Sequence, residues 1–348
     1  MVVLGIDAHK RTHTVVAVDE AGRRLGVRVT QATSTVAHLE LVRWAAGFGG
    51  DRRWAVEDCR HLSRRLEADL LAAGEGIVRV PPKLMAHARD SARTYGKSDP
   101  IDALAVARAA LREPDLPTAR LDGPDRELRL LVDHREDLVA ERTRALCRLR
   151  WHLHELDPEW DPAPRSLVSR KNLEAVAARL AGLAGLVASI ATEITIRVTG
   201  LTTRINELER EISTRVRQLA PSLLALPGVA ALTAAKIVAE TAGPARFKSK
   251  DAYARHNGTA PLPVWSGNRV RHRLARTGNR QLNCAIHRVA VTQKRIHPDA
   301  QAYLQRRLSA GNTPAEALRA LKRRLSDVIY RTLLADTTAT TAALSQAA

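Results

Sequence analysis

The sequence predicts an α/β domain followed by two predominantly helical regions. In the first hundred residues, short β-branched runs alternate with amphipathic stretches, which is the pattern of a sheet covered by helices. From Asp125 onward, apolar residues recur every three or four positions, which is helical spacing. The basic residues concentrate after position 243. We therefore expect three regions, at residues 1–115, 116–220 and 221–348.

The first region carries local signals for each element of an α/β layer. Asp19-Glu-Ala-Gly22 separates two β-branched runs and predicts a hairpin turn. Ser34 is a suitable cap for a helix that ends near Ala46, and Pro81-Pro82 ends the last strand. The expected strands are Val2–Ile6, His13–Asp19, Leu25–Thr30, Trp54–Val56 and Ile77–Val80, and a second helix is expected over 61–73.

Two apolar stripes predict a pair of long helices in the middle region. One stripe steps by seven, three, four and three through Val139, Leu146, Leu149, Leu153 and Leu156. The other steps by three or four through Leu201, Ile205, Leu208, Ile212, Val216 and Leu219. A proline-rich link separates them, so we expect an antiparallel arm. Either the arm joins copies of the chain into a dimer or tetramer, or its helices pack on their own domain.

Charge and composition narrow the classes of partner. The 348 residues contain 55 Lys and Arg against 37 Asp and Glu, a net charge of +18, which favours a polyanion such as nucleic acid. After position 243 the counts are 19 and five. Aromatic residues make up only 3%, which argues against a platform that stacks single-stranded bases. Three dispersed cysteines predict a reducing, cytoplasmic setting, and no uncharged stretch is long enough to span a membrane.

The last region contains three further signals. Leu226–Val238 is similar to a helix-hairpin-helix element, with Ala230 in the place of the usual second glycine. Thr313-Pro-Ala-Glu316 predicts a capping box that opens a final helix ending near Leu334. The basic cluster Lys322-Arg-Arg324 on that helix either contacts nucleic acid or forms a solvated face.

Four carboxylates are candidates for a metal site. Asp7 and Glu57 follow predicted strands, where α/β sheets bind ligands. Asp99 and Asp102 are three residues apart at the start of a helix expected to end near Leu111, so they share a helix face. A cluster of hard oxygen ligands suits two Mg²⁺ ions. The alternative is that these acids are only turn and helix-cap residues.

The basic region contains one isolated serine beside a dense run of arginines. Residues 256–268 have the composition of a loop, with Ser266-Gly267 as its turn. An extended segment follows, and Thr277-Gly-Asn279 is expected to cap the next helix. Ser266 is either a turn former or a nucleophile towards phosphorus. The candidate nucleic-acid contacts are Arg269, Arg271, Arg273, Arg276 and Arg280.

Together these motifs resemble the DEDD transposases and recombinases of the insertion-sequence "one-ten" family, which includes the Piv-type DNA invertases. The order of the motifs along the chain carries the resemblance. They are Gly5-Ile-Asp-Ala-His-Lys10, Val56-Glu-Asp58, Lys97-Ser-Asp-Pro-Ile-Asp-Ala103, Leu226-Pro-Gly228 with Arg246-Phe-Lys248, and Gly258-Thr-Ala-Pro261 through Ser266-Gly267 to Gly278-Asn-Arg280.

The resemblance implies a fold, a site and partners. It implies a RuvC-like, RNase H-type domain in which Asp7, Glu57, Asp99 and Asp102 hold Mg²⁺, and a C-terminal transposase domain in which Ser266 becomes joined to DNA. It also implies double-stranded donor and target DNA, a structured bridge RNA as guide, and a homo-oligomer in which the acids of one protomer act with the serine of another. The chain departs from the family's common Ser-Lys-x-Gly-Asn motif by reading Ala275-Arg-Thr-Gly-Asn279.

The expected function is therefore that of an insertion-sequence transposase that cleaves and exchanges DNA strands through a serine–DNA intermediate. One alternative is a RuvC-like junction nuclease that uses the same acids with water and forms no covalent bond. Another is a nucleic-acid-binding protein that is not an enzyme, in which the acids are only caps.

Overall fold

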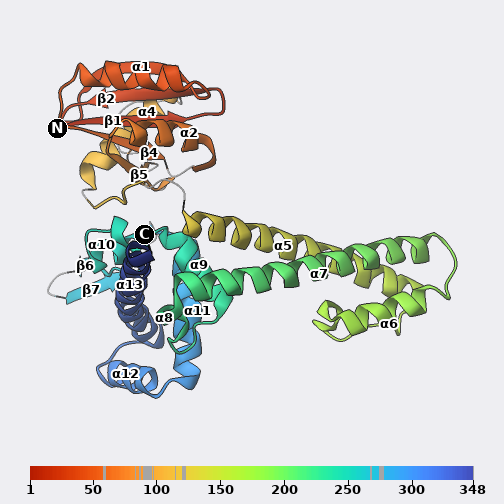
Figure 1. Ribbon diagram of the computed structural model, residues 1–348. Helices are drawn as coiled ribbons and strands as arrows, with labels where there is room; N and C mark the ends of the chain where they lie inside the picture. The colour runs from red at the N-terminus through yellow and green to blue at the C-terminus, as the bar shows by residue number, and fades with distance from the viewer. Residues whose placement is uncertain are drawn as a thin grey trace.

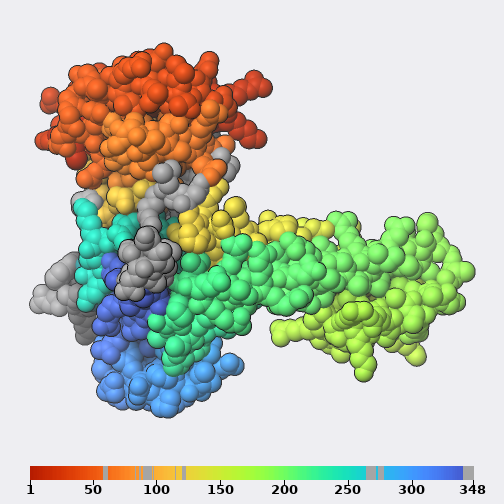
Figure 2. All heavy atoms as spheres, viewed as in Figure 1, coloured from red at the N-terminus to blue at the C-terminus, as the bar shows by residue number. Residues whose placement is uncertain are grey.

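The computed structural model describes residues 1–57, 60–82, 84, 85, 88, 96, 98–113, 115–119, 123–266, 269–273 and 278–347. An N-terminal α/β domain lies above a helical C-terminal domain, and an arm of long helices extends to one side (Figure 1). The space-filling view shows how far the arm projects from both domains (Figure 2). Among the described residues, no helix is long and apolar enough to cross a membrane.

A five-stranded mixed sheet forms the N-terminal domain. Its strand order is β3-β2-β1-β4-β5; β2 runs antiparallel to both its neighbours, while β1, β4 and β5 are parallel. The antiparallel meander followed by parallel strands is the RNase H-like arrangement, as the resemblance implies. The strands are β1 (Val2–Ala8), β2 (Thr12–Val18), β3 (Arg24–Gln31), β4 (Arg52–Glu57) and β5 (Ile77–Val80), which confirms the five predicted.

Helices cover both faces of this sheet. On one face, α1 (Thr35–Ala46) and α2 (Arg60–Ala72) bury Leu4 and Ile6 of β1, and Ser34 caps α1 as expected by accepting the amide of Ala37. The other face receives α4 (Asp99–Arg112), whose alanines pack on Val3 and Ala55. Successive strand residues point to opposite faces. Odd-numbered positions of β1 therefore face α4.

The arm is an antiparallel pair of helices, α5 (Pro124–Leu156) and α7 (Leu186–Leu219). Ion pairs of Glu127 with Arg215 and Glu141 with Arg197 fix the antiparallel register. The proline-rich link also contains a short 3-10 turn, η1 (Ser166–Val168), and a helix, α6 (Arg170–Leu180), that packs on the tip of the arm. At the base, Leu128, Val132, Leu208, Ile212 and Val216 join the core of the C-terminal domain.

The C-terminal domain packs helices around one core and carries a two-stranded hairpin. Its helical elements are α8 (Pro221–Leu224), α9 (Ala231–Thr241), η2 (Pro244–Arg246), α10 (Lys250–His256), α11 (Arg280–Ile296), α12 (Pro298–Ser309) and α13 (Pro314–Ala347). The hairpin is β6 (Leu262–Ser266) paired with β7 (Arg269–Arg273). The loop expected over 256–268 was therefore wrong for 262–266, since cross-strand pairing extends these residues.

The capping box at the start of α13 is confirmed, because Glu316 accepts hydrogen bonds from both the amide and the hydroxyl of Thr313. The helix does not end near Leu334, as the sequence suggested, but continues to Ala347. The tail beyond Leu334 is rich in alanine and threonine and has no proline or glycine to end the helix.

We expect Gly5→Ala to destabilise the α/β domain. A Cβ at this position would lie 2.1 Å from the carbonyl oxygen of Ala103 and 2.5 Å from the amide nitrogen of Ala107, so α4 would have to move off the sheet. Overpacking of this kind costs about 1–3 kcal/mol or more. Urea unfolding of the full chain measures the loss.

The matched control is Gly50→Ala, whose added Cβ would meet no described atom within 4 Å. It should change the free energy of unfolding by no more than about 0.5 kcal/mol. Equal effects of the two substitutions would contradict the close contact between β1 and α4.

Candidate active site

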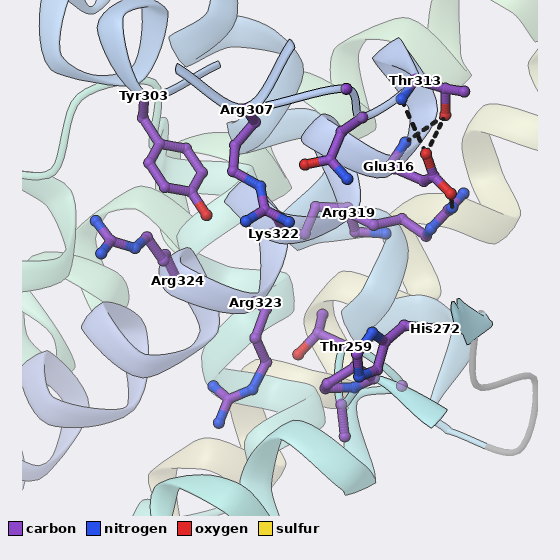
Figure 3. A pocket seen from close by; sticks show the side chains of 16 residues that line it. Thr259, His272, Tyr303, Arg307, Thr313, Glu316, Arg319, Lys322, Arg323 and Arg324 are labelled. Atoms are coloured by element: carbon purple, nitrogen blue, oxygen red, sulfur yellow. Dashed lines mark hydrogen bonds and ion pairs between the residues drawn. The ribbon is translucent and has the colours of Figure 1, made fainter. Parts of the chain in front are cut away.

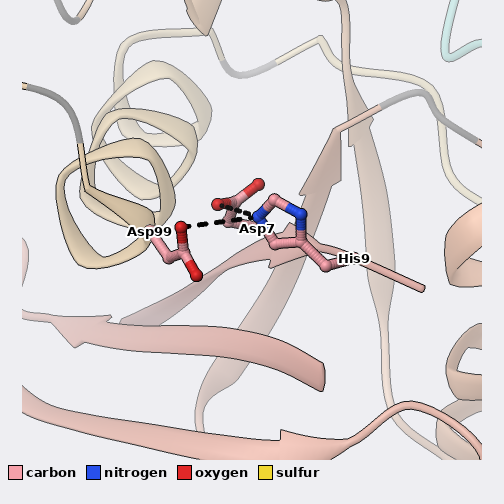
Figure 4. A group of neighbouring side chains, drawn as sticks. All are labelled: Asp7, His9 and Asp99. Atoms are coloured by element: carbon pink, nitrogen blue, oxygen red, sulfur yellow. Dashed lines mark hydrogen bonds and ion pairs between the residues drawn. The ribbon is translucent and has the colours of Figure 1, made fainter. Parts of the chain in front are cut away.

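The candidate site begins at the carboxyl end of β1, the central strand of the sheet. Asp7 is 7% exposed and its carboxylate faces the side covered by α4. The Nε2 atom of His9 lies 3.0 Å from Oδ2 of Asp7 and 3.6 Å from Oδ1 of Asp99 (Figure 4). The imidazole therefore bridges a carboxylate on the sheet and one on the helix.

The first turn of α4 supplies two carboxylates. Asp99 and Asp102 are both in this turn, with Asp99 exposed and Asp102 buried. The backbone carbonyl of Ser98 accepts the amide of Asp102, but the Ser98 hydroxyl makes no capping bond. The Ser98 side chain therefore does not cap this helix and does not order its first turn. Both acids are placed by the packing of α4 on β1.

Glu57 occupies the equivalent position on the neighbouring strand. The parallel register pairs Ile6 of β1 with Val56 of β4, so the next position on each strand is Asp7 and Glu57. Equivalent positions of paired strands point to the same face. Glu57 therefore stands beside Asp7 on the α4 side of the sheet, half-buried. Asp58, its neighbour in the sequence, lies outside the described residues.

The surroundings of Asp7 disfavour its charged form. Burial is the largest influence and raises the pKa of the Asp7 carboxyl above its usual range, and the nearby charges of Asp102 and Asp99 raise it further. The hydrogen bond from His9 opposes this shift. Acids held this close repel one another in their charged state, and a bound cation relieves such repulsion.

One atom from each of Asp7, His9 and Asp99 lies within 4.8 Å of the others, which is close enough for a shared metal ion. Carboxylate oxygens are the ligands preferred by Mg²⁺ and Mn²⁺, so the oxygen donors fit a divalent cation. His9 is the residue that reasoning from the sequence missed. Its signal was the Asp-x-His spacing at the end of the first strand.

The second part of the candidate site is the β6–β7 hairpin of the C-terminal domain. Ser266 ends β6 and pairs with Arg269, and Arg271 pairs with Val264, so residues 269–273 form an extended strand as predicted, with 269, 271 and 273 at alternate positions. The structure describes only the backbone of Ser266 and of these three arginines. Arg276 lies outside the described residues. Arg280 is exposed at the start of α11.

A close backbone contact closes the base of this hairpin. A Cβ at Gly278 would lie 2.3 Å from the amide nitrogen of Gly258, so only glycine allows the two chain segments to touch. The amide of Asn279 donates to the carbonyl of His256. The Asn279 side chain accepts the amide of Leu282, which caps α11, and donates to Glu240. This Gly-Asn pair thus fixes where the strand with Ser266 leaves the domain.

Two family models match the chain. One, described as a DEDD transposase, covers residues 4–158, and the other, described as transposase IS116/IS110/IS902 family, covers residues 220–305. The chain is 29% identical to a 42 kDa protein of insertion element IS900 from Mycobacterium paratuberculosis, over 94% of each chain. It is also 29% identical to a 44.8 kDa protein of insertion element IS116 from Streptomyces clavuligerus, over 95% of this chain and 94% of that one.

Solved structures of RuvC from Thermus thermophilus also match. The structure with a Holliday junction is 16% identical over 34% of this chain and 99% of RuvC, with a TM-score of 0.28. A second RuvC structure is 17% identical over 34% of this chain and all of RuvC, with a TM-score of 0.29. The assignment of the RNase H-like fold stands on the strand order and directions described above.

We expect Asp7→Asn to stabilise the metal-free protein at neutral pH. Because the folded-state pKa of Asp7 is raised, the folded chain binds this proton more tightly than the unfolded chain. The stability contributed by the protonated carboxyl is present at low pH and is lost as the pH rises through the folded pKa. Asparagine is neutral at every pH and avoids that loss.

Thermal midpoints measured in chelator from pH 4 to pH 8 test this expectation. The advantage of Asp7→Asn should grow as the pH rises, whereas Asp137→Asn, at an exposed position of α5, should show no such trend. An advantage of Asp7→Asn that shrinks with rising pH would mean that the Asp7 carboxyl is stabilised in its charged form.

Proposed function

The chain belongs to the IS116/IS110/IS902 family of transposases, and from this premise we propose that it moves its insertion element by Mg²⁺-dependent cleavage and exchange of DNA strands through a serine–DNA intermediate. The observation that carries the proposal is that Asp7 of β1 and Asp99 of α4 lie close enough to share a cation, while Glu57 of β4 occupies the strand position equivalent to Asp7. These acids lie within the stretch matched by the first transposase model.

In this mechanism Asp7, Glu57, Asp99 and Asp102 hold the metal. When bound, two Mg²⁺ ions supply charge stabilisation for the attacking and leaving oxygens at phosphorus. Asp7 is held rigidly by its strand, and the two aspartates of α4 are fixed by the contact of that helix with β1. His9 orients Asp7 by hydrogen bonding to its Oδ2 atom, and it also lies near Asp99.

The covalent step belongs to Ser266. Its Oγ attacks the scissile phosphorus and gives up its proton, the bond from phosphorus to the 3′ oxygen breaks, and that oxygen leaves as a 3′ hydroxyl after taking up a proton. The new phosphoserine bond conserves the energy of the broken one. Rejoining reverses the step on a different 3′ hydroxyl, so no nucleotide triphosphate is required.

The roles of the acids and of Ser266 imply which partners the chain binds. Donor and target DNA contact the basic segment that extends from β7 to the start of α11, with Arg269, Arg271, Arg273, Arg276 and Arg280 on phosphates. A structured bridge RNA selects both DNAs, as the resemblance implies. The acids belong to the α/β domain and Ser266 to the β6–β7 hairpin of the C-terminal domain, and these two domains have separate hydrophobic cores and lie one above the other (Figure 1). This separation suits a homo-oligomer in which the arm brings the acids of one protomer to the serine of another.

Ser266→Ala should abolish both strand exchange and the covalent protein–DNA adduct, because alanine has no oxygen to bond to phosphorus. Incubation with a nicked element end, followed by denaturing electrophoresis, measures the adduct. Ser309→Ala, at an exposed position near the end of α12, is the control and should form the adduct normally. Cleavage by wild type without any adduct would instead indicate a junction nuclease that uses water.

Asp102→Asn should lower the rate of strand cleavage by at least about a hundredfold, because loss of a metal-binding carboxylate removes several kcal/mol of transition-state stabilisation. Wild type should gain thermal stability on addition of MgCl₂, and the variant should gain much less. Asp137→Asn again serves as the control with the same change of charge. Normal cleavage by Asp102→Asn, or by wild type in chelator, would contradict the metal role.

A further inference from the structure

A basic pocket lies between the base of the β6–β7 hairpin and helices α12 and α13. Its volume is about 580 Å³, within the range of small-ligand sites. Thr259 and His272 border it on the hairpin side, and Tyr303, Arg307 and Arg324 lie at the opposite end (Figure 3). None of these residues belongs to the acidic cluster of the α/β domain.

The lining of this pocket is strongly positive. Five of its side chains are Lys or Arg and a single one is acidic, and the five are Arg307, Arg319, Lys322, Arg323 and Arg324. The acid, Glu316, is engaged by the capping box with Thr313 and lies 3.9 Å from Arg319. Arg323 is paired with Asp251 and Asp327 outside the lining. The excess charge therefore rests on Arg307, Lys322 and Arg324.

Two of these cations form no ion pair with any described residue. The Nε atom of Arg307 is buried and has no hydrogen-bond acceptor in the described part of the chain. The guanidinium of Arg324 lies over the ring of Tyr303, 4.6 Å from its centroid. Such stacking orients a guanidinium while its N–H groups stay available to a ligand. A buried donor without an acceptor is costly, and a bound anion removes that cost.

Lys322 reinforces the positive charge from the floor of the pocket. It is 7% exposed, and its Nζ atom donates to the Oδ1 atom of Asn283 at 2.6 Å, which is a neutral acceptor. Burial lowers the pKa of the Lys322 ammonium. The basic cluster of α13 is therefore not simply a solvated face, since its first residue turns inward.

The position of the pocket relates it to the hairpin with Ser266. His272 lines the pocket and pairs with Pro263, which is three residues before Ser266 on β6. At about 3.3 Å per strand residue, that separation is about 10 Å along the strand. A nucleic-acid strand with one phosphate in the pocket can therefore continue along the hairpin towards the serine.

We propose that this pocket binds a backbone phosphate of nucleic acid, with Arg307 and Arg324 as its principal ligands and Lys322 behind them. The proposal rests on the proposed function and adds a binding site to it. Guanidinium groups match phosphate oxygens as paired donors, which favours a phosphodiester over a point-like anion. DNA and RNA share this chemistry, so the test below separates them.

The experiment uses the full chain with Ser266→Ala, so that binding is measured without reaction. Arg307→Gln and Arg324→Gln are compared with Arg331→Gln, which removes an exposed arginine from the same helix as Arg324 outside the pocket. Fluorescence anisotropy measures affinity over a range of salt for a duplex from the element end and, separately, for RNA transcribed from the flank of the element.

Each pocket variant should lower affinity about tenfold at physiological ionic strength, the effect of one lost charge-assisted contact. The slope of the logarithm of the binding constant against the logarithm of the salt concentration should be smaller in magnitude than that of the parent, by about 0.9 for duplex DNA or about 0.7 for a single strand. Arg307→Lys, which keeps the charge, should retain the slope. A change confined to one of the two nucleic acids identifies it as the source of the phosphate.

Unchanged affinity and slope for both nucleic acids would overturn the proposal, as would an equal loss in Arg331→Gln. If the pocket variants instead lost only their binding to an acidic peptide, the pocket would be assigned to a protein partner, and the proposal would be overturned as well. The adduct assay of wild type is independent of these measurements. If wild type forms the adduct and the pocket variants bind normally, the pocket proposal fails and the proposed function stands. If binding depends on the pocket and no adduct forms, the proposed function fails and the pocket proposal stands.

Discussion

The contact of α4 with β1 at Gly5 is the constraint on which the candidate site depends. The helix backbone approaches the strand so closely that no side chain fits between them. Asp7 lies two residues after Gly5 on the strand, and Asp102 lies one residue before Ala103 on the helix. The same contact that builds the core therefore sets the distance between the acids of the sheet and those of the helix.

This arrangement holds together groups that repel one another. The alanine-rich face of α4 packs on β1, β4 and β5, and this apolar burial opposes the repulsion among the carboxylates at the end of the helix. Burial is the largest cause of the raised pKa of Asp7, and the nearby charges of Asp102 and Asp99 add to it. Acids that are already held close together are suited to bind a cation, because binding then requires little rearrangement of the ligands.

Local signals in the sequence predicted the elements well, since caps and turns act over a few residues. Ser34, the Asp19–Gly22 turn and the Thr313 capping box all function as expected. The sequence did not reveal β6 or the place of His9. A strand of mixed composition such as Leu-Pro-Val-Trp-Ser is stabilised by its partner strand, and the contacts of His9 depend on a helix ninety residues later. Both depend on tertiary contacts that periodicity does not encode.

The distribution of charge separates two kinds of arginine. In the α/β domain, Arg52 and Arg79 are partly buried and paired with Glu75 and Glu67, so they contribute little net field. Among residues 244–348 of the C-terminal domain, 19 basic residues outnumber five acidic ones, and Arg307 and Arg324 have no ion-pair partner among the described residues. Unpaired cations attract phosphate, whereas clustered carboxylates repel it unless a cation intervenes. In the proposed function, the C-terminal domain therefore attracts a DNA strand first, and the acidic edge of the α/β domain approaches the same phosphate once that edge carries metal.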